Sequence, residues 1–323
     1  MMTTLIRTLI LALALLTHFS GMSQAFPNKP IRVVIGFPAG GPLDQHARLL
    51  VDRLQTQLGQ PVLIDYKPGA GGIVGAQEVM KSPADGYTMM LGNTGVMVIN
   101  PAIYSKLPYQ TLRDFTPIAR TAMQPLAFLV NPGVPVKTLP EFIQYAKARP
   151  GQINYGSAGN GGSSHLVPEM LKSAAGLFMV HIPYRGSAPA FTDLMAGQVQ
   201  FMAESIPLAA QYHKQGKVRA LAVTSRERSS ALPEVPTAIE SGLNDFEVVG
   251  FYGFMAPAGT PPEVVRVLSE AFKVVLSQPD LRARMTTQGA DPAFLGAEDF
   301  SKYLRSELPR WASVVKKSGA QID

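Results

Sequence analysis

The sequence predicts an α/β protein with two lobes and a cleft between them. Short apolar runs rich in β-branched residues alternate with amphipathic helical stretches, a pattern typical of α/β folds with mainly parallel sheets. The alternating series starts twice, near residue 33 and again at residue 126, and a helix-rich segment follows the second series. Two series followed by a helical return indicate two lobes that more than one crossing strand connects.

The first 25 residues predict a cleaved secretory signal. Arg7 gives a positively charged start, Leu9 to Leu16 form an apolar core, and Ser23-Gln24-Ala25 is a small-residue cleavage site. A lone membrane anchor is the alternative, but this core is shorter than the ~20 residues that span a bilayer. We therefore expect cleavage near Ala25-Phe26 and a soluble, exported product.

The composition excludes several classes of function. Removing the signal leaves 298 residues, enough for two domains of ~100–200 residues each. The chain has no cysteine, which excludes disulfides, thiolate metal sites, cysteine nucleophiles and a lipoprotein anchor. Without Arg7 the formal net charge falls from +6 to +5. The densest basic stretch, Arg219 to Arg228, includes Glu227 and lacks aromatic residues, so we expect no nucleic-acid binding.

The first series begins with a strand, a glycine-rich turn and a helix. The β-branched run Val33 to Ile35 predicts a strand that is buried on both faces. After Gly40 and Gly41, apolar residues recur every three or four positions up to Leu58, which predicts a helix with Pro42 at its first position. The remaining expected elements are strands over residues 62–64 and 88–91, a helix over residues 73–80 and an irregular stretch over residues 100–120.

The same strand and helix patterns predict the elements of the second series and of the return. Expected strands cover residues 126–130, 153–155, 179–183, 199–202 and 218–223, and expected helices cover residues 139–149, 166–175 and 187–194. An extended segment over residues 246–255 leads to helices over residues 261–276 and 300–315. We therefore predict residues 26–125 as the first part of lobe 1, residues 126–249 as lobe 2, and residues 250–323 as the return to lobe 1.

The turn before the first helix predicts an anion site. The first four N–H groups of a helix lack intrahelical partners, and glycines ahead of them let a ligand approach. Tight packing alone would explain one such turn, but the stretch Gly156 to His165 repeats it with glycines, hydroxyls and an amide. Neither turn contains lysine or arginine. Two helix starts, each with roughly half a positive charge, could hold both ends of a dicarboxylate; a monocarboxylate needs one.

Two enzyme-like motifs compete with this interpretation. Gly69 to Gly75 follows a strand and opens a helix, but Val74 stands where the third glycine of a dinucleotide-binding turn belongs. Gly156-Ser157-Ala158-Gly159 is similar to a nucleophile elbow, but Tyr155 replaces the first glycine of that motif. A serine hydrolase using Ser157 is therefore a minor alternative, and a dinucleotide cofactor is not expected.

The ionisable residues leave two readings open. The histidines show no metal-binding spacing, so we expect no metal; His165 alone stands at a candidate helix start. Asp44 is either a first-turn carboxylate that stabilises its own helix or a cleft group that faces a ligand amine. Glu204, which follows the strand at residues 199–202, has the same two readings. If both face the cavity, an amino acid is a better ligand than a plain diacid.

A series of short motifs is spread in order along the whole mature chain. In the first half they are Phe37-Pro-Ala-Gly-Gly-Pro-Leu-Asp44, Ala47-Arg48, Pro68-Gly-Ala-Gly-Gly72, Asp85-Gly-Tyr-Thr88, Leu107-Pro-Tyr109 and Asp114-Phe115. In the second half they are Tyr155-Gly-Ser-Ala-Gly-Asn160, His165-Leu166, Pro183-Tyr184, Arg219-Ala-Leu-Ala-Val-Thr-Ser225 and Ala256-Pro-Ala-Gly-Thr-Pro261. Together these motifs resemble the tripartite tricarboxylate transporter receptor family, also called the Bug family.

The resemblance implies a periplasmic solute-binding protein of the two-lobed type II fold. It implies a receptor without cofactor or catalysis, a monomer, that closes on a small carboxylate and delivers it to the membrane permease of a tripartite transporter. The carboxylate would be a di- or tricarboxylate, an amino acid or an aromatic acid. The implied contacts are backbone groups and ordered water. The candidate ligand-binding residues are Phe37, Ala39, Gly40, Gly41, Asp44, Asn93, Thr94, Ser157, Ala158, Asn160, Gly161, Ser163, His165, Tyr184 and Glu204. A sensor subunit for a signalling partner would bind the same ligands.

Some positions depart from the family pattern. Gly36 stands where proline is usual, Asp65-Tyr66 where Glu-Asn is common, and Pro168 where glycine is frequent. Glu204 stands where aspartate is usual. Because Pro168 and Glu204 lie nearest the predicted site, the sequence leaves the identity of the ligand open.

Overall fold

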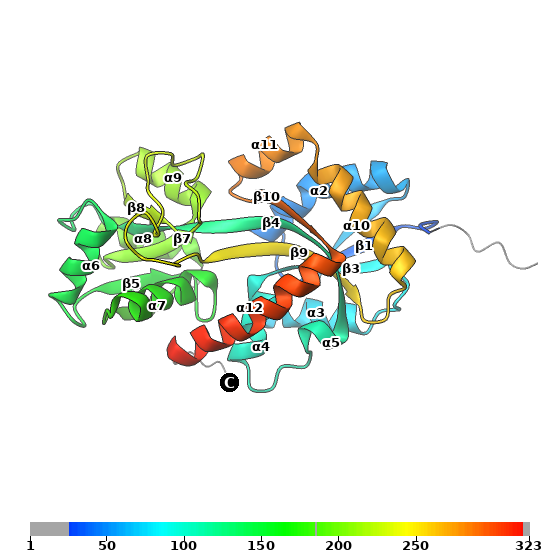
Figure 1. Ribbon diagram of the computed structural model, residues 1–323, viewed down its shortest axis with the longest axis horizontal. Helices are drawn as coiled ribbons and strands as arrows, with labels where there is room; N and C mark the ends of the chain where they lie inside the picture. Colours follow the sequence, from blue (N-terminus) through cyan, green and yellow to red (C-terminus); the bar gives the residue numbers. More distant parts are fainter. Residues whose placement is uncertain (1–25, 185, 319–323) are drawn as a thin grey trace, which may run out of the picture.

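The computed structural model describes residues 26–184 and 186–318. The predicted secretory signal, residues 1–25, lies outside the described residues. Figure 1 shows two lobes side by side along the long axis of the molecule, with long strands running from one lobe into the other. The two-lobed α/β prediction is therefore confirmed.

The first lobe begins with parallel strands and the helices that connect them. Its first elements are β1 (Ile31–Ile35), α2 (Pro42–Leu58), β2 (Val62–Tyr66), η1 (Ala70–Gly72), α3 (Ile73–Met80) and β3 (Thr88–Asn93). Strand β1 pairs in parallel with β2 on one side and with β3 on the other. Val33 packs in the core against α2 and Val34 in the core against α3. The strand is thus buried on both faces, as its β-branched run predicted.

The stretch expected to be irregular contains the start of the longest strand. After η2 (Gly95–Ile99), α4 (Asn100–Ile103) and α5 (Thr111–Asp114) comes β4, which runs without a break from Phe115 to Val130. The prediction of irregular structure up to residue 120 is therefore wrong at its end. Pro117 lies in the strand where the register with its partner shifts, and proline is tolerated in strands at such bulges.

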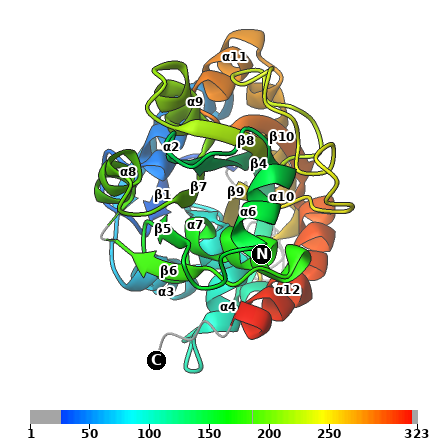
Figure 2. The ribbon, with the colours of Figure 1, turned by 90° about the vertical axis from the view of Figure 1, so that its left-hand side faces the viewer.

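The second lobe places helices on both faces of its strands. Its elements are α6 (Leu139–Lys147), β5 (Asn154–Ser157), α7 (Ser163–Ala175), β6 (Val180–Pro183), α8 (Ser187–Ala196), β7 (Phe201–Ser205), α9 (Ile206–Lys214) and β8 (Arg219–Val223). Figure 2 views this lobe end-on, with its helices around the strands. One core cluster joins α6 and α7 to the sheet, and another joins α8 and α9 to it. Helix α9 was not predicted from the sequence.

Antiparallel pairing dominates where the lobes meet. Strand β9 (Val249–Pro257) returns to the first lobe and lies antiparallel between β3 and β4, while β4 is also antiparallel to β7 and β8. Among the named strand pairs within the described residues, four are parallel and five are antiparallel. The expectation of mainly parallel sheets is therefore wrong, because the crossing strands run opposite to each other and to their neighbours.

The C-terminal part returns to the first lobe and contacts the second. It contains α10 (Pro262–Leu276), α11 (Pro279–Thr287), β10 (Asp291–Gly296) and α12 (Ala297–Ser318); α11 and β10 were not predicted. Helix α12 runs from the first lobe towards the second (Figure 1). Its Trp311 is buried and donates from Nε1 to Glu307 Oε2 at 2.9 Å, so Trp311 is a packing residue, as expected. Arg310 on the same helix donates to the backbone oxygen of Glu247.

The sheet does not stop between the lobes, because β4 belongs to both. It pairs with β9 up to Pro125 and with β7 from Leu126 onwards. The predicted boundaries after residue 125 and after residue 249 fall at this change of partner and at the first residue of β9. As boundaries of independent lobes they stay predictions.

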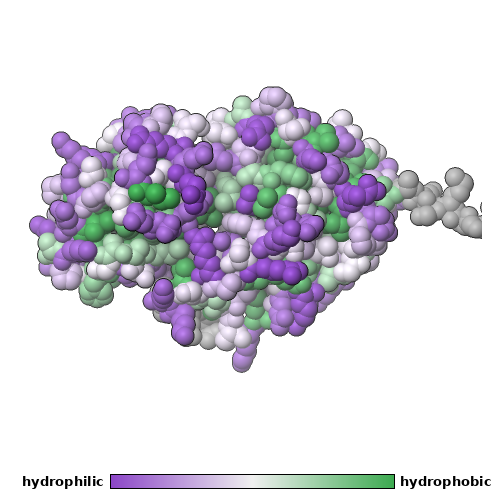
Figure 3. Space-filling model, in the orientation of Figure 1, coloured by the Kyte–Doolittle hydropathy of each residue, from purple (hydrophilic) through white to green (hydrophobic). Residues whose placement is uncertain are grey.

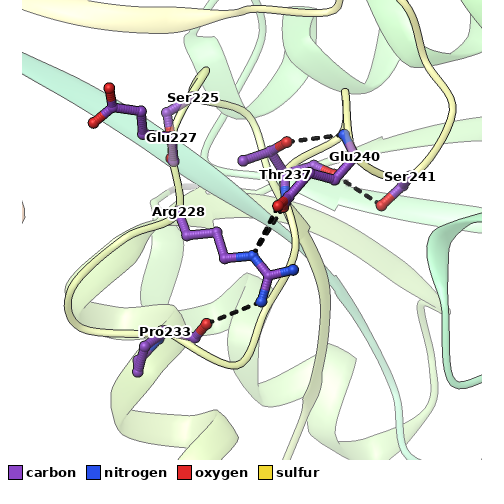
Figure 4. Close-up of polar contacts among 7 residues, drawn as sticks. All are labelled: Ser225, Glu227, Arg228, Pro233, Thr237, Glu240 and Ser241. Carbon is purple, nitrogen blue, oxygen red and sulfur yellow. Dashed lines mark hydrogen bonds and ion pairs between the residues drawn. The ribbon is translucent and has the colours of Figure 1, made fainter.

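The connection between β8 and β9 is held by a polar network (Figure 4). Thr237 and Glu240 cap each other, since each backbone N–H donates to the other's side chain at 2.7 and 3.0 Å. Arg228 donates from Nε to Glu240 and from Nη1 to the backbone oxygen of Pro233. The Arg228 hydrogen bond lowers the pKa of the Glu240 carboxyl. These contacts fix the proline-rich segment ahead of β9.

On the face shown in Figure 3, hydrophilic and hydrophobic residues are interspersed over both lobes. Large hydrophobic side chains that are exposed include Phe178 and Leu63, which lie in different lobes. Within residues 26–184 and 186–318, no helix is long and apolar enough to cross a membrane.

Candidate functional site

A pocket of about 520 Å³ lies between the lobes, within the range of small-molecule sites, roughly 300–1,000 Å³. From the first lobe and the crossing strands it is lined by Phe37, Pro38, Ala39, Gly41, Pro42, Leu43, Asn93, Thr94, Gly95, Gln124, Leu126, Gly250 and Tyr252. From the second lobe it is lined by Ala158, Gly162, Ser163, Ser164, Ser187, Glu204, Ser205 and Leu208.

Four helices begin at this pocket. The N-caps of α2 and α7 are Gly41 and Gly162, and both line it. Ser187, the first residue of α8, and Ser205, the N-cap of α9, also line it. A helix N-terminus has about half a positive charge. The described part of the lining contains no lysine, arginine or histidine.

The turn before α2 leaves its first N–H groups without a side-chain cap. Gly41 adopts ordinary extended angles, φ −78° and ψ 174°, and makes no side-chain cap hydrogen bond. A Cβ added there would meet only the backbone oxygen of Pro38, at 3.6 Å. Gly40 just before it has φ +84°, a conformation that favours glycine. The first turn of α2 is thus open to an anionic group.

Asp44 supports this turn from behind and does not line the pocket. Its carboxylate accepts from Tyr66 Oη at 2.6 Å and from the Gly40 N–H at 2.7 Å, and it pairs with Arg48 Nε at 2.9 Å. Burial acts to raise the pKa of Asp44, but the bonds from Tyr66, Gly40 and Arg48 outweigh it and the pKa lies below its usual value. Of the two readings of Asp44, this geometry favours the structural one.

Neutral side chains support the turn before α7. His165 Nδ1 accepts from the Gly161 N–H at 3.1 Å, and Ser164 Oγ accepts from the Ala158 N–H at 3.0 Å. The His165 ring stacks on His181 with centroids 3.9 Å apart and an 8° angle. Burial lowers the pKa of His165, and burial followed by the charges of its neighbours lowers the pKa of His181 to about 3. Both rings are therefore uncharged at neutral pH.

Ser157 also stabilises the turn before α7. Its side chain is fully buried, does not line the pocket, and shares a hydrogen bond of 2.6 Å with His181 Nε2. It also exchanges hydrogen bonds with the backbone of Gly159. The helix after this turn begins at Ser163, three residues before the predicted start.

The structure brings about half of the predicted site residues to the pocket. Those that line it are Phe37, Ala39, Gly41, Asn93, Thr94, Ala158, Ser163 and Glu204. Those that do not line it are Gly40, Asp44, Ser157, Asn160, Gly161, His165 and Tyr184. Tyr184 instead donates to Asp193 at 2.6 Å. As ligand contacts, all of them stay predictions.

The lining residues that sequence reasoning missed come mainly from the crossing strands and from later helix starts. Gln124 and Leu126 lie on β4, Gly250 and Tyr252 on β9, and Ser205 at the start of α9. Pro207 at the second position of α9 was an available signal for that helix start.

Glu204 is the one lining carboxylate among the described residues. Its side chain is 8% exposed. Oε1 accepts from the backbone N–H of Ser205 at 2.7 Å, whereas Oε2 is shielded from solvent and has no hydrogen-bond partner in the described part of the chain. Within residues 26–184 and 186–318, no three histidine, aspartate or glutamate side chains are grouped so that they could hold a metal ion.

The fold and the pocket define a two-lobed solute-binding protein of the periplasmic type II class. The profile described as "Tripartite tricarboxylate transporter family receptor" matches residues 46–320. Protein BugT of Bordetella pertussis (strain Tohama I) is 33% identical over 301 residues, which cover 93% of this chain and 92% of BugT. The chain therefore belongs to the tripartite tricarboxylate transporter receptor family, and the motif resemblance is confirmed.

Three solved structures are similar over nearly the whole chain. R. palustris Rpa4515 with adipate is 32% identical with a TM-score of 0.81, covering 92% of this chain and 100% of that one. The periplasmic binding protein BugD is 34% identical with a TM-score of 0.77, covering 92% and 99%. MatC from Rhodopseudomonas palustris with bound malate is 34% identical with a TM-score of 0.76, covering 90% and 100%.

Proposed function

We propose that this protein is an exported, periplasmic receptor that binds a small carboxylate between its lobes and delivers it to the permease subunits of a tripartite transporter. The observation that carries the proposal is the convergence of two uncapped helix N-termini, those of α2 and α7, on one pocket. Similar proteins have been solved with adipate and with malate, which supports a carboxylate ligand.

The ligand carboxylate is held by main-chain N–H groups and ordered water at Gly41 and Gly162. A helix N-terminus stabilises an anion by about 0.3–1 kcal/mol, and by up to ~2 kcal/mol where it is partly buried. Several N-termini around one pocket therefore reach a useful affinity without a cationic side chain. Strands β4 and β9, the two crossing segments, act as the hinge when the lobes close.

The proposed role is that of a monomeric receptor without catalysis. The hydroxyl of Ser157, the candidate nucleophile, is buried behind the α7 turn and lies outside the pocket lining. A substrate in the pocket would not reach this hydroxyl. The family and its similar solved structures are binding receptors, which supports the same conclusion.

The test places a negative charge at each helix start. In Gly41→Asp and Gly162→Asp, the new carboxylate occupies a backbone position that accepts a side chain, since both glycines have negative φ and neither Cβ meets an atom closer than 3.6 Å. Aspartate is a favoured N-cap, so we expect stability to change by less than about 1 kcal/mol. The added charge takes the N–H groups and repels the ligand, so affinity falls more than about 100-fold, or about 2.7 kcal/mol.

The matched controls are Gly41→Ala and Gly162→Ala, which add a Cβ but no charge. Isothermal titration with succinate, malate, aspartate and adipate measures affinity, and thermal unfolding confirms the fold. We expect the alanine variants to stay within about threefold of the native protein. Native affinity in both aspartate variants would contradict the proposed site.

A further inference from the structure

Asp44 and Glu204, the two acidic residues whose roles the sequence left open, differ in how fully their carboxylate oxygens are hydrogen-bonded. Both are more than nine-tenths buried, Asp44 with 3% and Glu204 with 8% of their surface exposed. Both oxygens of Asp44 have partners, supplied by Tyr66, Gly40 and Arg48. Glu204 uses only Oε1, on the Ser205 N–H, and leaves Oε2 without one in the described structure. Because a buried polar atom without a partner is costly, Oε2 of Glu204 needs a donor that residues 26–184 and 186–318 do not provide.

The surroundings of Glu204 narrow the kind of donor. Glu204 is the penultimate residue of β7, lies opposite Ala127 of β4, and precedes Ser205, the N-cap of α9. The lining residues on β4 and β9 and at the start of α9 are Gln124, Leu126, Gly250, Tyr252, Ser205 and Leu208. None of these is a cation. Burial raises the pKa of the Tyr252 hydroxyl and the Glu204 charge raises it further, so Tyr252 stays neutral.

A dicarboxylate without an amino group is disfavoured on the side of the pocket that Glu204 lines. Its two carboxylates would share the pocket with a third, that of Glu204, without a described lysine or arginine in the lining. Like charges in a desolvated site repel strongly. A ligand that brings its own cation removes this repulsion and provides the missing donor at the same time.

We propose that Glu204 Oε2 accepts a hydrogen bond from a ligand ammonium group, so that the protein's ligand is an amino acid whose carboxylate lies at the helix N-termini. This inference rests on the proposed carboxylate receptor and specifies its ligand class. Rotation about the terminal torsion of the glutamate, which has a broad energy profile, turns Oε2 towards the ligand. Asp44 has no part in selecting the ligand, since its oxygens are already occupied.

The test compares ligands that differ in one substituent. The matched series are propionate, lactate and alanine; succinate, malate and aspartate; glutarate, 2-hydroxyglutarate and glutamate; and adipate with 2-aminoadipate. Titration calorimetry measures each against the native protein, Glu204→Gln and Glu204→Asp. Glu227→Gln is the control, because Glu227 is an exposed glutamate of the same lobe and does not line the pocket.

In the series that binds, we expect the amino member to bind the native protein on the order of 10- to 100-fold more tightly than the unsubstituted acid. Glu204→Gln keeps the shape but places an NH₂ donor beside the ligand, so the preference falls to about twofold or reverses towards the plain acid. Glu204→Asp keeps the charge and part of the preference. Glu227→Gln leaves the preference unchanged, and thermal unfolding verifies the fold of each variant.

Other outcomes overturn the inference. Equal binding of all members of a series, a preference for the hydroxy acid over the amino acid, or an amino preference that survives Glu204→Gln each excludes the ammonium contact. In those cases the carboxylate still binds and the aspartate variants at Gly41 and Gly162 still abolish binding, so the proposed receptor function stands. Binding of an aromatic acid, with no member of these series bound, would also exclude the ammonium contact and leave the proposed receptor function standing. Binding of no carboxylate overturns both proposals.

Discussion

The two turns that open α2 and α7 present the same backbone to the pocket but are held by different chemistry. Their glycine N-caps have nearly the same angles, φ −78° and ψ 174° at Gly41 and φ −76° and ψ 168° at Gly162. Behind Gly41 lies a charged network centred on Asp44. Behind Gly162 lies a stack of neutral histidines, His165 on His181. The geometry offered to a ligand is therefore separable from the interactions that maintain it.

This difference has a consequence for pH. The pKa of Asp44 lies below its usual value, so its contribution to stability is present above about pH 3.8 and is lost as the pH falls through the lower folded pKa. The histidines have folded pKa values below 6.5, so protons favour the unfolded state as soon as the pH falls below about 6.5. The histidine stack behind the α7 turn should weaken in mild acid, where the Asp44 network behind the α2 turn is unaffected.

The largest expected effect comes from removing the centre of the charged network. Asp44→Ala leaves the Tyr66 hydroxyl and the Gly40 N–H without their acceptor, and a hydrogen bond to a charged group contributes about 1.5–3 kcal/mol. We expect a loss of about 3 kcal/mol in the free energy of unfolding, measured by urea denaturation. The comparison variant Asp52→Asn removes an exposed carboxylate of the same helix, and it should be within about 0.5 kcal/mol of the native protein. Similar stabilities for the two variants would show that Asp44 is dispensable.

The parts of the fold that the sequence predicted are those with a local cause. Glycines 40 and 41, Pro42 and the periodicity up to Leu58 fix the start and end of α2, and the structure confirms both. The part of β4 before residue 126 escaped prediction because Pro117 interrupts its pattern, and the pairing with β9 extends the predicted strand back to Phe115. The antiparallel order was equally hidden, since it depends on where the chain returns after residue 249.

The same distinction holds at the candidate site. The two glycine turns were predicted from the sequence, because each stands between a strand pattern and a helix pattern, and residues of both line one pocket. The roles of Asp44 and Glu204 could not be separated from the sequence. Arg48, one turn further along the helix, could be recognised from the sequence as a partner of Asp44. Tyr66 could not, because it reaches Asp44 from strand β2. Glu204 Oε2 has no hydrogen-bond partner among the described residues, and this depends on how the chain folds around it, which the sequence alone does not reveal.

The second prediction uses mild acid to separate the two turns. Between pH 6.5 and 5 we expect the free energy of unfolding to fall by up to about 1.4 kcal/mol per pH unit for each buried neutral histidine, less for His181 because it is partly exposed. His46 on α2 contributes as well, since burial lowers its pKa to about 3. Urea denaturation at closely spaced pH values measures the slope.

The variant His181→Phe isolates the share of the α7 turn. Phenylalanine keeps a ring against His165 but has no ring nitrogen that could bind a proton. It also leaves Ser157 without the hydrogen bond of 2.6 Å that His181 provides. We expect lower stability at pH 7 but a shallower slope below pH 6.5 than in the native protein. A slope equal to that of the native protein would exclude His181 as a source of the acid sensitivity and assign it to His46, His165 or other groups.

The smallest expected effects come from one hydrogen bond in each turn. Tyr66→Phe removes the hydroxyl that donates to Asp44, and Ser164→Ala removes the oxygen that accepts from the Ala158 N–H. Each should cost about 0.5–1.5 kcal/mol, as one hydrogen bond does. Tyr66→Phe should stay at the upper end because its bond is to a charged group, and Ser164→Ala at the lower end because Ala158 is exposed and water can replace the hydroxyl. Urea denaturation at pH 7 measures both, and the reverse order would mean that the neutral support is the stronger of the two.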